Sequence, residues 1–381
     1  MLDRLHPTRS SLAFVFATAA LTAPAAARAQ EHPPRICSPS DPIDLVSTSR
    51  SSAVDIALSG TSPATMWLLY SKENGAGEES AYLMEVSDVG GADLTIRSNR
   101  AIGQGSVMQG GLAIVGANVV AVYLRPDRRI GVSTRPITGS AAPTTLTLEG
   151  GDSPFGLSVA AVGNRALVAW DDPNDGIRYA WLDGAGTQPG PVQMVAGHFG
   201  AAVASGAFGG TLVFADAPGA SAHLSLAAAA PNARSLVARA SASNTAVSAL
   251  ASSDTARGTA VTYTTSNEVH LATFDAANGT GRDRVLGGAT VATETVVATA
   301  PWGVFTAWTL ENNVRVLPLA HDGSETTGQF TVHGASGRER MRLPAMAAFG
   351  STAILVWNAS NLAPRPDGST TAVRMVRVEC R

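Results

Sequence analysis

Residues 165–182, with the sequence RALVAWDDPNDGIRYAWL, contain the pattern from which the fold can be predicted. Residues 166–170 form a short apolar run that ends in Trp170, which is typical of a buried β-strand. Asp, Pro, Asn and Gly fill positions 171–176, as a turn requires, and a second apolar run follows at 177–182. The stretch therefore predicts two antiparallel strands joined by a turn.

The same apolar run ending in an aromatic residue recurs along the chain at intervals of 44 to 53 residues. The aromatic residues are Tyr70, Tyr123, Trp170, Phe214, Tyr263, Trp308 and Trp357. A regular period of this size indicates a repeat protein, and four strands with their turns fill about this length. We therefore expect an all-β fold, a single β-propeller of about seven four-stranded blades. Six or eight blades remain possible, and a pair of β-sandwiches is the rival all-β fold.

Other strands of the repeat are also visible in most units. A strand of small residues precedes each aromatic run, for example at 158–162, 201–204 and 345–349. Small side chains suit the innermost strand, where blades crowd around a narrow axis. A second turn and a short outer strand close the unit, as at 329–332.

The two ends of the chain complement each other. The last unit has no residues for an outer strand after 373–378, whereas residues 43–47 form a surplus strand ahead of the first innermost strand at 53–58. Antiparallel pairing of these segments completes the last blade and covers an open edge. It also brings together Cys37 and Cys380, the only cysteines, and predicts a disulfide between them. Two free thiols are the alternative.

The first residues have the features of an export signal. Arg4 and Arg9 precede an almost wholly apolar run at 12–23, and Ala27 and Ala29 supply small residues for signal peptidase. We expect a signal peptide at 1–29 cleaved after Ala29, an N-terminal segment at 30–42 and a propeller domain at 43–381. No lipoprotein box precedes Cys37, and no apolar stretch has the roughly 18 residues of a membrane span. These features predict a secreted or periplasmic protein without membrane insertion.

Composition and motifs exclude several classes of function. The formal net charge of −3 gives no electrostatic reason to bind nucleic acid. The histidines occur singly, without the paired spacing of a metal site, and no Walker loop or Gly-x-Ser-x-Gly elbow is present. We expect no cofactor and no metal.

The repeats over residues 43–380 resemble those of secreted bacterial β-propellers, whose blades read small strand, apolar–aromatic strand, turn, strand and Asp-Gly turn. The architecture is sialidase-like, but the Ser-x-Asp-x-Gly-x-Thr-Trp box of sialidases does not occur. The resemblance implies an architecture rather than an activity, because propellers serve hydrolases, lyases, lectins and scaffolds alike.

Basic residues recur at one position, the residue after the first apolar residue of each third strand. The residues there are Tyr82, Gly131, Arg178, His223, His270, Arg315 and Arg374. The loops that link blades share this face, and they carry Asp152, His198, Asn244, Glu294, Arg340 and Arg342. The pattern predicts a partial basic ring around the channel mouth that binds an anionic ligand through Arg178, His198, His270, Arg315, Arg340 and Arg374. The alternative is that these side chains lie between blades and pair with carboxylates or carbonyls.

The catalytic residues, if any exist, are unknown from sequence. The first hypothesis is a non-catalytic binding or interaction module for a glycan or a partner protein. The second is a polysaccharide hydrolase or lyase that uses Asp152, Asp171 and Glu294, which requires two acids roughly 5–10 Å apart. A structural component of a surface or spore coat is the third.

Overall fold

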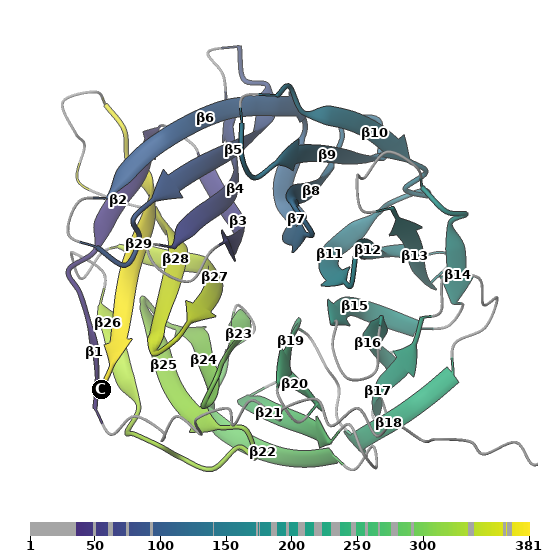
Figure 1. The fold of residues 1–381 in the computed structure, drawn as a ribbon. Helices are drawn as coiled ribbons and strands as arrows, with labels where there is room; N and C mark the ends of the chain where they lie inside the picture. The colour runs from purple at the N-terminus through teal and green to yellow at the C-terminus, as the bar shows by residue number, and fades with distance from the viewer. Residues whose placement is uncertain are drawn as a thin grey trace, which may run out of the picture. The chain divides into compact units, whose positions relative to one another are not determined.

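The repeated aromatic runs occupy the second strand of consecutive antiparallel sheets in the computed structural model (Figure 1). The structure describes residues 36–381 except 49–50, 60–63, 74–75, 92–93, 140, 173, 175, 184–188, 196–197, 205–209, 217–222, 230–236, 245–248, 256–257, 266, 276–280, 291–292, 334–338, 361–362 and 364–367. For 48, 51–54, 106–109, 198–204, 215–216, 223, 225, 228, 237–244, 249–255, 333 and 343–344 it describes the backbone alone. The expected signal peptide lies outside the described residues.

The first three sheets follow one another along the chain, and each has four strands in sequential order. Sheet 1 contains β3 (Ser51–Ser59), β4 (Thr65–Glu73), β5 (Glu79–Ser87) and β6 (Thr95–Gln104). Sheet 2 contains β7 (Ser106–Val115), β8 (Asn118–Leu124), β9 (Ile130–Pro136) and β10 (Thr144–Leu148). Sheet 3 contains β11 (Phe155–Val162), β12 (Arg165–Asp172), β13 (Gly176–Leu182) and β14 (Gln193–Val195).

The next three sheets repeat this order. Sheet 4 contains β15 (His198–Ala204), β16 (Thr211–Asp216), β17 (His223–Ala228) and β18 (Val237–Asn244). Sheet 5 contains β19 (Ala249–Thr255), β20 (Gly258–Thr264), β21 (Glu268–Asp275) and β22 (Gly281–Gly288). Sheet 6 contains β23 (Thr295–Ala300), β24 (Gly303–Leu310), β25 (Asn313–Ala320) and β26 (Phe330–His333).

The last sheet, called the terminal sheet below, combines both ends of the chain. It contains β27 (Arg340–Phe349), β28 (Thr352–Ser360) and β29 (Thr371–Cys380), and two N-terminal strands pair with β29. These are β2 (Ile43–Thr48), opposite the first half of β29, and β1 (Cys37–Pro39), opposite its end. The all-β propeller with four-stranded blades is confirmed. The expectation of about seven four-stranded blades needs correction, since six sheets of the described chain have four strands and the terminal sheet has five.

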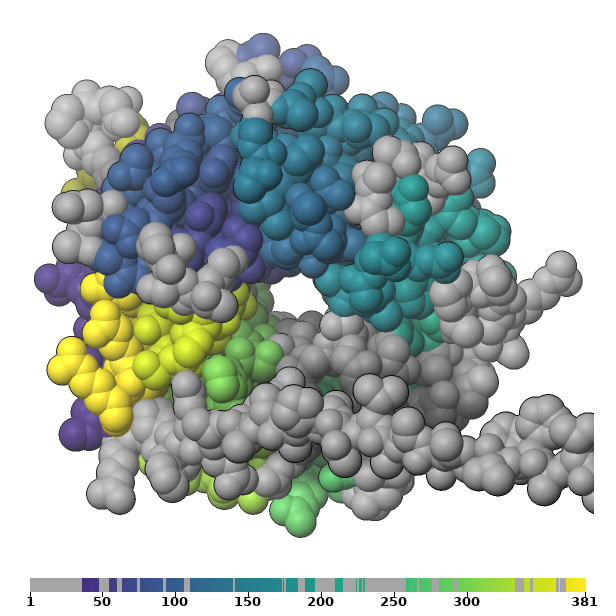
Figure 2. Space-filling view, in the orientation of Figure 1, coloured from purple at the N-terminus to yellow at the C-terminus, as the bar shows by residue number. Residues whose placement is uncertain are grey.

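The first strands of the sheets lie side by side around the centre of Figure 1, where Figure 2 shows a hollow. Each contacts the first strand of the next sheet, and β27 contacts β3. The predicted small-residue strands β11, β15 and β27 are among them, since small side chains allow this close approach.

The apolar core is divided among the joints between sheets. Each buried cluster of the described residues combines side chains from two consecutive sheets, and one cluster joins the terminal sheet to sheet 1. The aromatic residues of the second strands lie in these clusters: Trp170, Trp308 and Trp357 are at most 1% exposed. The core therefore holds neighbouring sheets together and fixes the side chains at each joint. Among the described residues, no helix has the length and apolar character needed to span a membrane.

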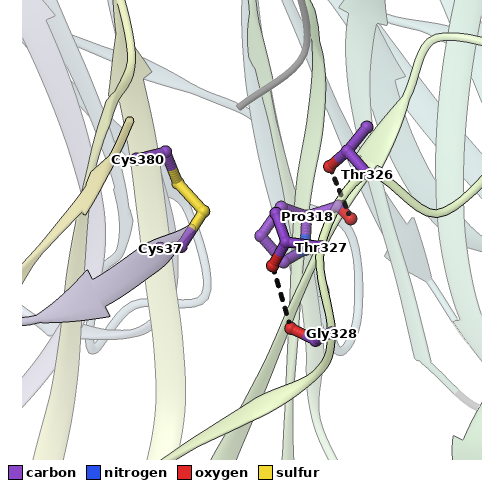
Figure 3. Close-up of a disulfide and its surroundings, with 6 residues drawn as sticks. All are labelled: Cys37, Pro318, Thr326, Thr327, Gly328 and Cys380. Atoms are coloured by element: carbon purple, nitrogen blue, oxygen red, sulfur yellow. Dashed lines mark hydrogen bonds between the residues drawn. A yellow bond between two sulfur atoms is a disulfide. The ribbon is translucent and has the colours of Figure 1, made fainter. Parts of the chain in front are cut away.

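The predicted disulfide is confirmed. Cys37 and Cys380 are direct partners in the β1–β29 pairing, and their sulfur atoms are bonded (Figure 3). The bridge links residues 343 positions apart, and Cys380 packs into the apolar cluster that the terminal sheet shares with sheet 6. Ile36 and Arg381 exchange two backbone hydrogen bonds next to it, of 3.1 and 2.8 Å, so the pairing continues past the disulfide.

Candidate functional site

The aromatic residue of each second strand has a fixed partner on the third strand. The cross-strand partners are Tyr70 and Tyr82, Tyr123 and Gly131, Trp170 and Arg178, Phe214 and Ser225, Tyr263 and His270, Trp308 and Arg315, and Trp357 and Arg374. The predicted third-strand position is therefore real in six sheets. It was wrong for His223: β17 begins at this residue, and Ser225 lies opposite Phe214.

Four of these partners form what we call the aromatic–basic pairs: Trp170–Arg178, Tyr263–His270, Trp308–Arg315 and Trp357–Arg374. Directly opposed residues of an antiparallel pair project from the same face of the sheet. In each pair the aromatic ring packs into the cluster shared with the preceding sheet. The basic side chains therefore lie at the joints between sheets, and the ring around the channel mouth that the sequence suggested stays a prediction.

Arg178 of sheet 3 is held by a carboxylate of its own sheet. Its Nε lies 3.5 Å from Oδ2 of Asp172, whose side chain is fully buried. The same carboxylate accepts hydrogen bonds from the backbone N–H groups of Asp152 (2.9 Å) and Asn174 (3.1 Å). The indole of Trp170 donates to the carbonyl of Gly150 at 2.7 Å. This pair thus lies beside the loop that links sheets 2 and 3.

Arg374 of the terminal sheet has two carboxylate partners. Its Nε donates to Oδ1 of Asp44 on β2 at 2.7 Å, and its Nη1 donates to Oε2 of Glu339 at 2.6 Å. The Glu339 side chain is fully buried and precedes β27, while the Arg374 side chain is 9% exposed. The guanidinium therefore connects the N-terminal strand, the C-terminal strand and the loop that enters the sheet.

His270 of sheet 5 lies between two acids. Its Nδ1 is 3.1 Å from Oδ2 of Asp283, and its Nε2 is 3.3 Å from Oε2 of Glu268. The ring stacks on Tyr263 with centroids 4.8 Å apart, and the Tyr263 hydroxyl donates to Asp283 at 2.9 Å.

These contacts shift the ionisation of both partners. The hydrogen bond with Asp283 raises the pKa of His270, and burial only partly offsets it. Partial burial opposes ionisation of Asp283, but hydrogen bonds from His270 and Tyr263 outweigh it and lower the pKa of this carboxyl. The two groups therefore favour the charged pair.

Arg315 of sheet 6 differs from the other three basic residues. Its Nη1 donates to the Thr331 hydroxyl on β26. No carboxylate of the described residues forms an ion pair with it, and its buried Nε has no hydrogen-bond partner there. The buried indole N–H of its partner Trp308 likewise has no acceptor within the described part of the chain.

The other predicted basic residues occupy strand starts. Arg340 begins β27, pairs with Ser360 and is exposed, as is Arg342 two residues later. His198 begins β15 opposite Asp216, and Asn244 ends β18 opposite His223; the side chains of both lie outside the described residues.

The three candidate catalytic acids belong to two separate sheets. Asp171 is the second-last residue of β12 in sheet 3 and is buried, and Asp152 lies exposed in the loop before that sheet. Glu294 precedes sheet 6, where its N–H and carbonyl bond to Thr309. Asp152 and Asp171 therefore belong to sheet 3 and its entering loop, and Glu294 to the start of sheet 6; their use as a catalytic pair stays a prediction. Among the described residues, no group of three or more His, Cys, Asp and Glu side chains is arranged to hold a metal ion.

Sequence reasoning missed the carboxylates that complete these contacts. Asp44 could have been found, because pairing residues 43–47 with 373–378 places it near Arg374. Asp55 on β3 was also missed: it accepts the N–H groups of Ile56 (2.8 Å) and of Leu112 on β7 (2.7 Å). Burial raises the pKa of Asp55 to about 7, even though both backbone hydrogen bonds lower it.

Comparisons with known proteins identify the fold alone. No protein-family model and no curated protein sequence matches the chain. A protein of unknown function from Dyadobacter fermentans is 11% identical, with a TM-score of 0.52 over 91% of this chain and 99% of that one. The phage phi92 endosialidase is 8% identical, with a TM-score of 0.51 over 90% of this chain and 69% of its own. The SapL1 lectin, solved in complex with alpha methyl fucoside, is 12% identical, with a TM-score of 0.47 over 76% of this chain and 98% of that one.

Proposed function

We propose that the chain is an exported, non-catalytic propeller that binds an anionic saccharide on the face carrying the loops between sheets. The ligand-binding residues in this proposal are Arg178, His198, His270, Arg315, Arg340 and Arg374. The exposed arginines Arg340 and Arg342 receive the ligand, and Arg315, the basic residue of the aromatic–basic pairs without a carboxylate partner among the described residues, supplies further positive charge. Arginine suits this role because its planar fork of donors matches carboxylate and sulfate groups.

The proposal includes a closed ring with a cleaved signal peptide. In it the terminal sheet acts as a seventh blade, and β2 fills the place of its outer strand. Support comes from the contact of β27 with β3 and the pairing of β2 with β29. The disulfide supports export after cleavage at Ala29, since such bonds persist in oxidising compartments. The first residue of the exported protein, determined by N-terminal sequencing, should be Gln30.

Binding is favoured over hydrolysis because the carboxylates in this region are paired with basic side chains. Asp172, Glu339 and Asp283 are bound to Arg178, Arg374 and His270, and two of the three are fully buried. Hydrolysis of a glycosidic bond needs two acids facing each other across the substrate. The acids near the basic side chains instead act as counter-charges that hold these side chains in place.

The experiment is a binding screen with residues 30–381. The protein is passed over immobilised polygalacturonate, alginate, heparin and polysialic acid, with dextran as the neutral control. We expect retention on at least one acidic polymer that weakens as salt increases, and weaker retention for the Arg340→Gln/Arg342→Gln variant. Equal elution from dextran and from every acidic polymer overturns the proposal and leaves a partner protein as the binding target. Release of reducing ends or unsaturated products identifies a hydrolase or lyase instead.

A further inference from the structure

The four aromatic–basic pairs differ in how the basic side chain is neutralised. Asp172 neutralises Arg178, Asp283 and Glu268 flank His270, and Asp44 and Glu339 bind Arg374. In sheet 6 alone, within the described residues, the basic side chain is bound only to a neutral hydroxyl, that of Thr331. From this difference we infer that Arg315 receives a carboxylate from the bound ligand. The inference deepens the proposed function and rests on it.

The β-sheet register shows where this carboxylate belongs. Arg374 lies directly opposite Asp44 on the neighbouring outer strand, and Arg315 lies directly opposite Thr331 in the same way. Thr331 therefore occupies the position of Asp44, and its side chain lacks the negative charge. The Arg315 guanidinium binds Thr331 through Nη1, which leaves Nε and Nη2 for a ligand.

A second observation at the same joint points to a missing acceptor. Trp308 is 1% exposed, and its indole Nε1 is buried without an acceptor among the described residues. The equivalent Trp170 donates to the Gly150 carbonyl at 2.7 Å, whereas the buried indole N–H of Trp357 likewise has no acceptor among the described residues. Buried donors are nearly always bonded, so a cluster of unbonded donors calls for an ion, a water or a ligand. At this joint the cross-strand neighbours Arg315 and Trp308 both present such donors.

The facing sheet places a glycine against the Trp308 indole. Gly287 of β22 lies beside the Trp308 ring: a Cβ added there would be 3.0 Å from Cζ2 and 3.7 Å from Nε1. A larger residue at this position would cover the edge of the indole. The ligand group that best fits a guanidinium and a neighbouring N–H is a carboxylate, because each of its two oxygens accepts hydrogen bonds. For an anionic saccharide this group is the carboxylate of a sugar acid.

The test introduces into sheet 6 the carboxylate that neutralises the arginine in the terminal sheet. Thr331→Asp places a carboxylate opposite Arg315 as Asp44 lies opposite Arg374, and Thr331→Asn is the uncharged control of equal size. Arg315→Gln removes the charge, and Arg97→Gln on the exposed outer strand β6 makes the same charge change elsewhere. Binding of sodium D-glucuronate, with D-glucose as the neutral probe, is measured by calorimetry at constant ionic strength.

We expect wild type, Thr331→Asn and Arg97→Gln to bind glucuronate with similar affinity. Thr331→Asp and Arg315→Gln should lower the affinity by about tenfold or more, as loss of a charge-assisted hydrogen bond does. Thr331→Asp should do so without lowering the thermal midpoint, which separates occupation of the site from unfolding.

Three outcomes overturn the inference. These are equal binding of glucuronate by wild type and Thr331→Asp, equal binding of glucose and glucuronate, and displacement of glucuronate by chloride at equal concentration. The wider proposal is judged separately: if acidic polymers are retained while Thr331→Asp retains them as well as wild type, the protein binds anionic saccharides through other residues. Absence of any retention overturns both.

Discussion

The terminal sheet and the joint between sheets 1 and 2 are held together by different means. In the terminal sheet, strands from both ends of the chain are fastened by the Cys37–Cys380 disulfide and by Arg374 between Asp44 and Glu339. At the joint between sheets 1 and 2, the chain passes directly from β6 to β7. Two hydrogen bonds that involve backbone groups join these sheets: the Leu112 N–H donates to the Asp55 carboxylate, and the Tyr123 hydroxyl donates to the Ile102 carbonyl.

The difference follows from chain entropy. Bringing together two strands more than 300 residues apart costs more conformational entropy than joining consecutive strands, so the terminal sheet needs stronger fastenings. The disulfide provides a covalent link, and Arg374 connects strands from both ends of the chain. At a local joint, polar side chains need only satisfy the backbone N–H and C=O groups that the close approach of two sheets buries.

The largest effect should come from removing the disulfide. Replacing Cys37 and Cys380 by Ala should lower the free energy of unfolding by up to about 5 kcal/mol, because the unfolded chain is released from a loop of 343 residues. Chemical denaturation of the oxidised protein and the double variant measures this change. Reduction of the wild-type protein should have the same effect and should leave the double variant unchanged. Equal stability of both proteins would show that the β2–β29 pairing suffices to close the sheet.

The second effect is a pH dependence at the joint between sheets 1 and 2. Asp55 has a pKa of about 7 in the folded protein against 3.8 ordinarily, so the folded state binds the proton more tightly. Its contribution to stability is fully present below about pH 4 and is lost as pH rises to about 7, by an amount on the order of 4 kcal/mol.

Urea unfolding between pH 4.5 and pH 8 measures this loss. Asp55→Asn cannot titrate, so its stability should decline less over the range, and the difference between the two curves isolates Asp55 from the histidines. Parallel curves for the two proteins would contradict the prediction. The disulfide variant should retain the wild-type dependence, because its change lies in the terminal sheet.

The third effect concerns the buried charge at the terminal sheet. Arg374→Met removes the arginine that is paired with the fully buried Glu339 and should cost about 3 kcal/mol of unfolding free energy. Arg374→Met/Glu339→Met removes both charges and should recover most of the loss. Arg381→Met, which alters an ion pair whose arginine is 88% exposed, is the control and should leave stability unchanged. A double variant as unstable as Arg374→Met would mean that Asp44, rather than Glu339, is the partner that matters.

The sequence predicted those parts of the molecule that depend on period and on strand order. The aromatic spacing gives the repeated sheets, and alignment of the third strands places Arg178, His270, Arg315 and Arg374 in register with their aromatic partners. The same alignment failed in sheet 4 because β17 begins at His223, which makes Leu224 its first apolar residue. Apolar character alone does not show where a strand begins when small residues also occur in loops.

The acidic partners of the basic residues could not be predicted from the sequence in the same way. Asp172, Asp283 and Glu339 come from a second strand, an outer strand and a linking loop, so they share no sequence spacing with the arginines and histidine they contact. The role of Asp55 depends on a bulge between Ala53 and Asp55 in the β3–β4 pairing. A bulge changes which face a residue occupies without altering the pattern of apolar residues around it.

The smallest effect should come from the glycine at the third-strand position of sheet 2. The Tyr123 ring lies where a side chain at 131 would project: a Cβ on Gly131 would be 2.5 Å from Cζ of the ring, and Gly103 crowds its hydroxyl from another strand. Gly131→Ala should therefore displace the ring and weaken the 3.1 Å bond to the Ile102 carbonyl, at a cost of about 2 kcal/mol.

Gly328→Ala is the matched control, since open space surrounds that position and its φ lies outside the left-handed region. In sheets 1 and 5 the corresponding residues, Tyr82 and His270, stack on the aromatic ring at 5.2 and 4.8 Å, so a side chain at this position is compatible with the repeat. If Gly131→Ala is as stable as wild type, the Tyr123 ring has moved to the stacked arrangement of those sheets. The hydrogen bond from the Tyr123 hydroxyl to the Ile102 carbonyl would then result from the space left by the glycine and would not stabilise the joint between the sheets.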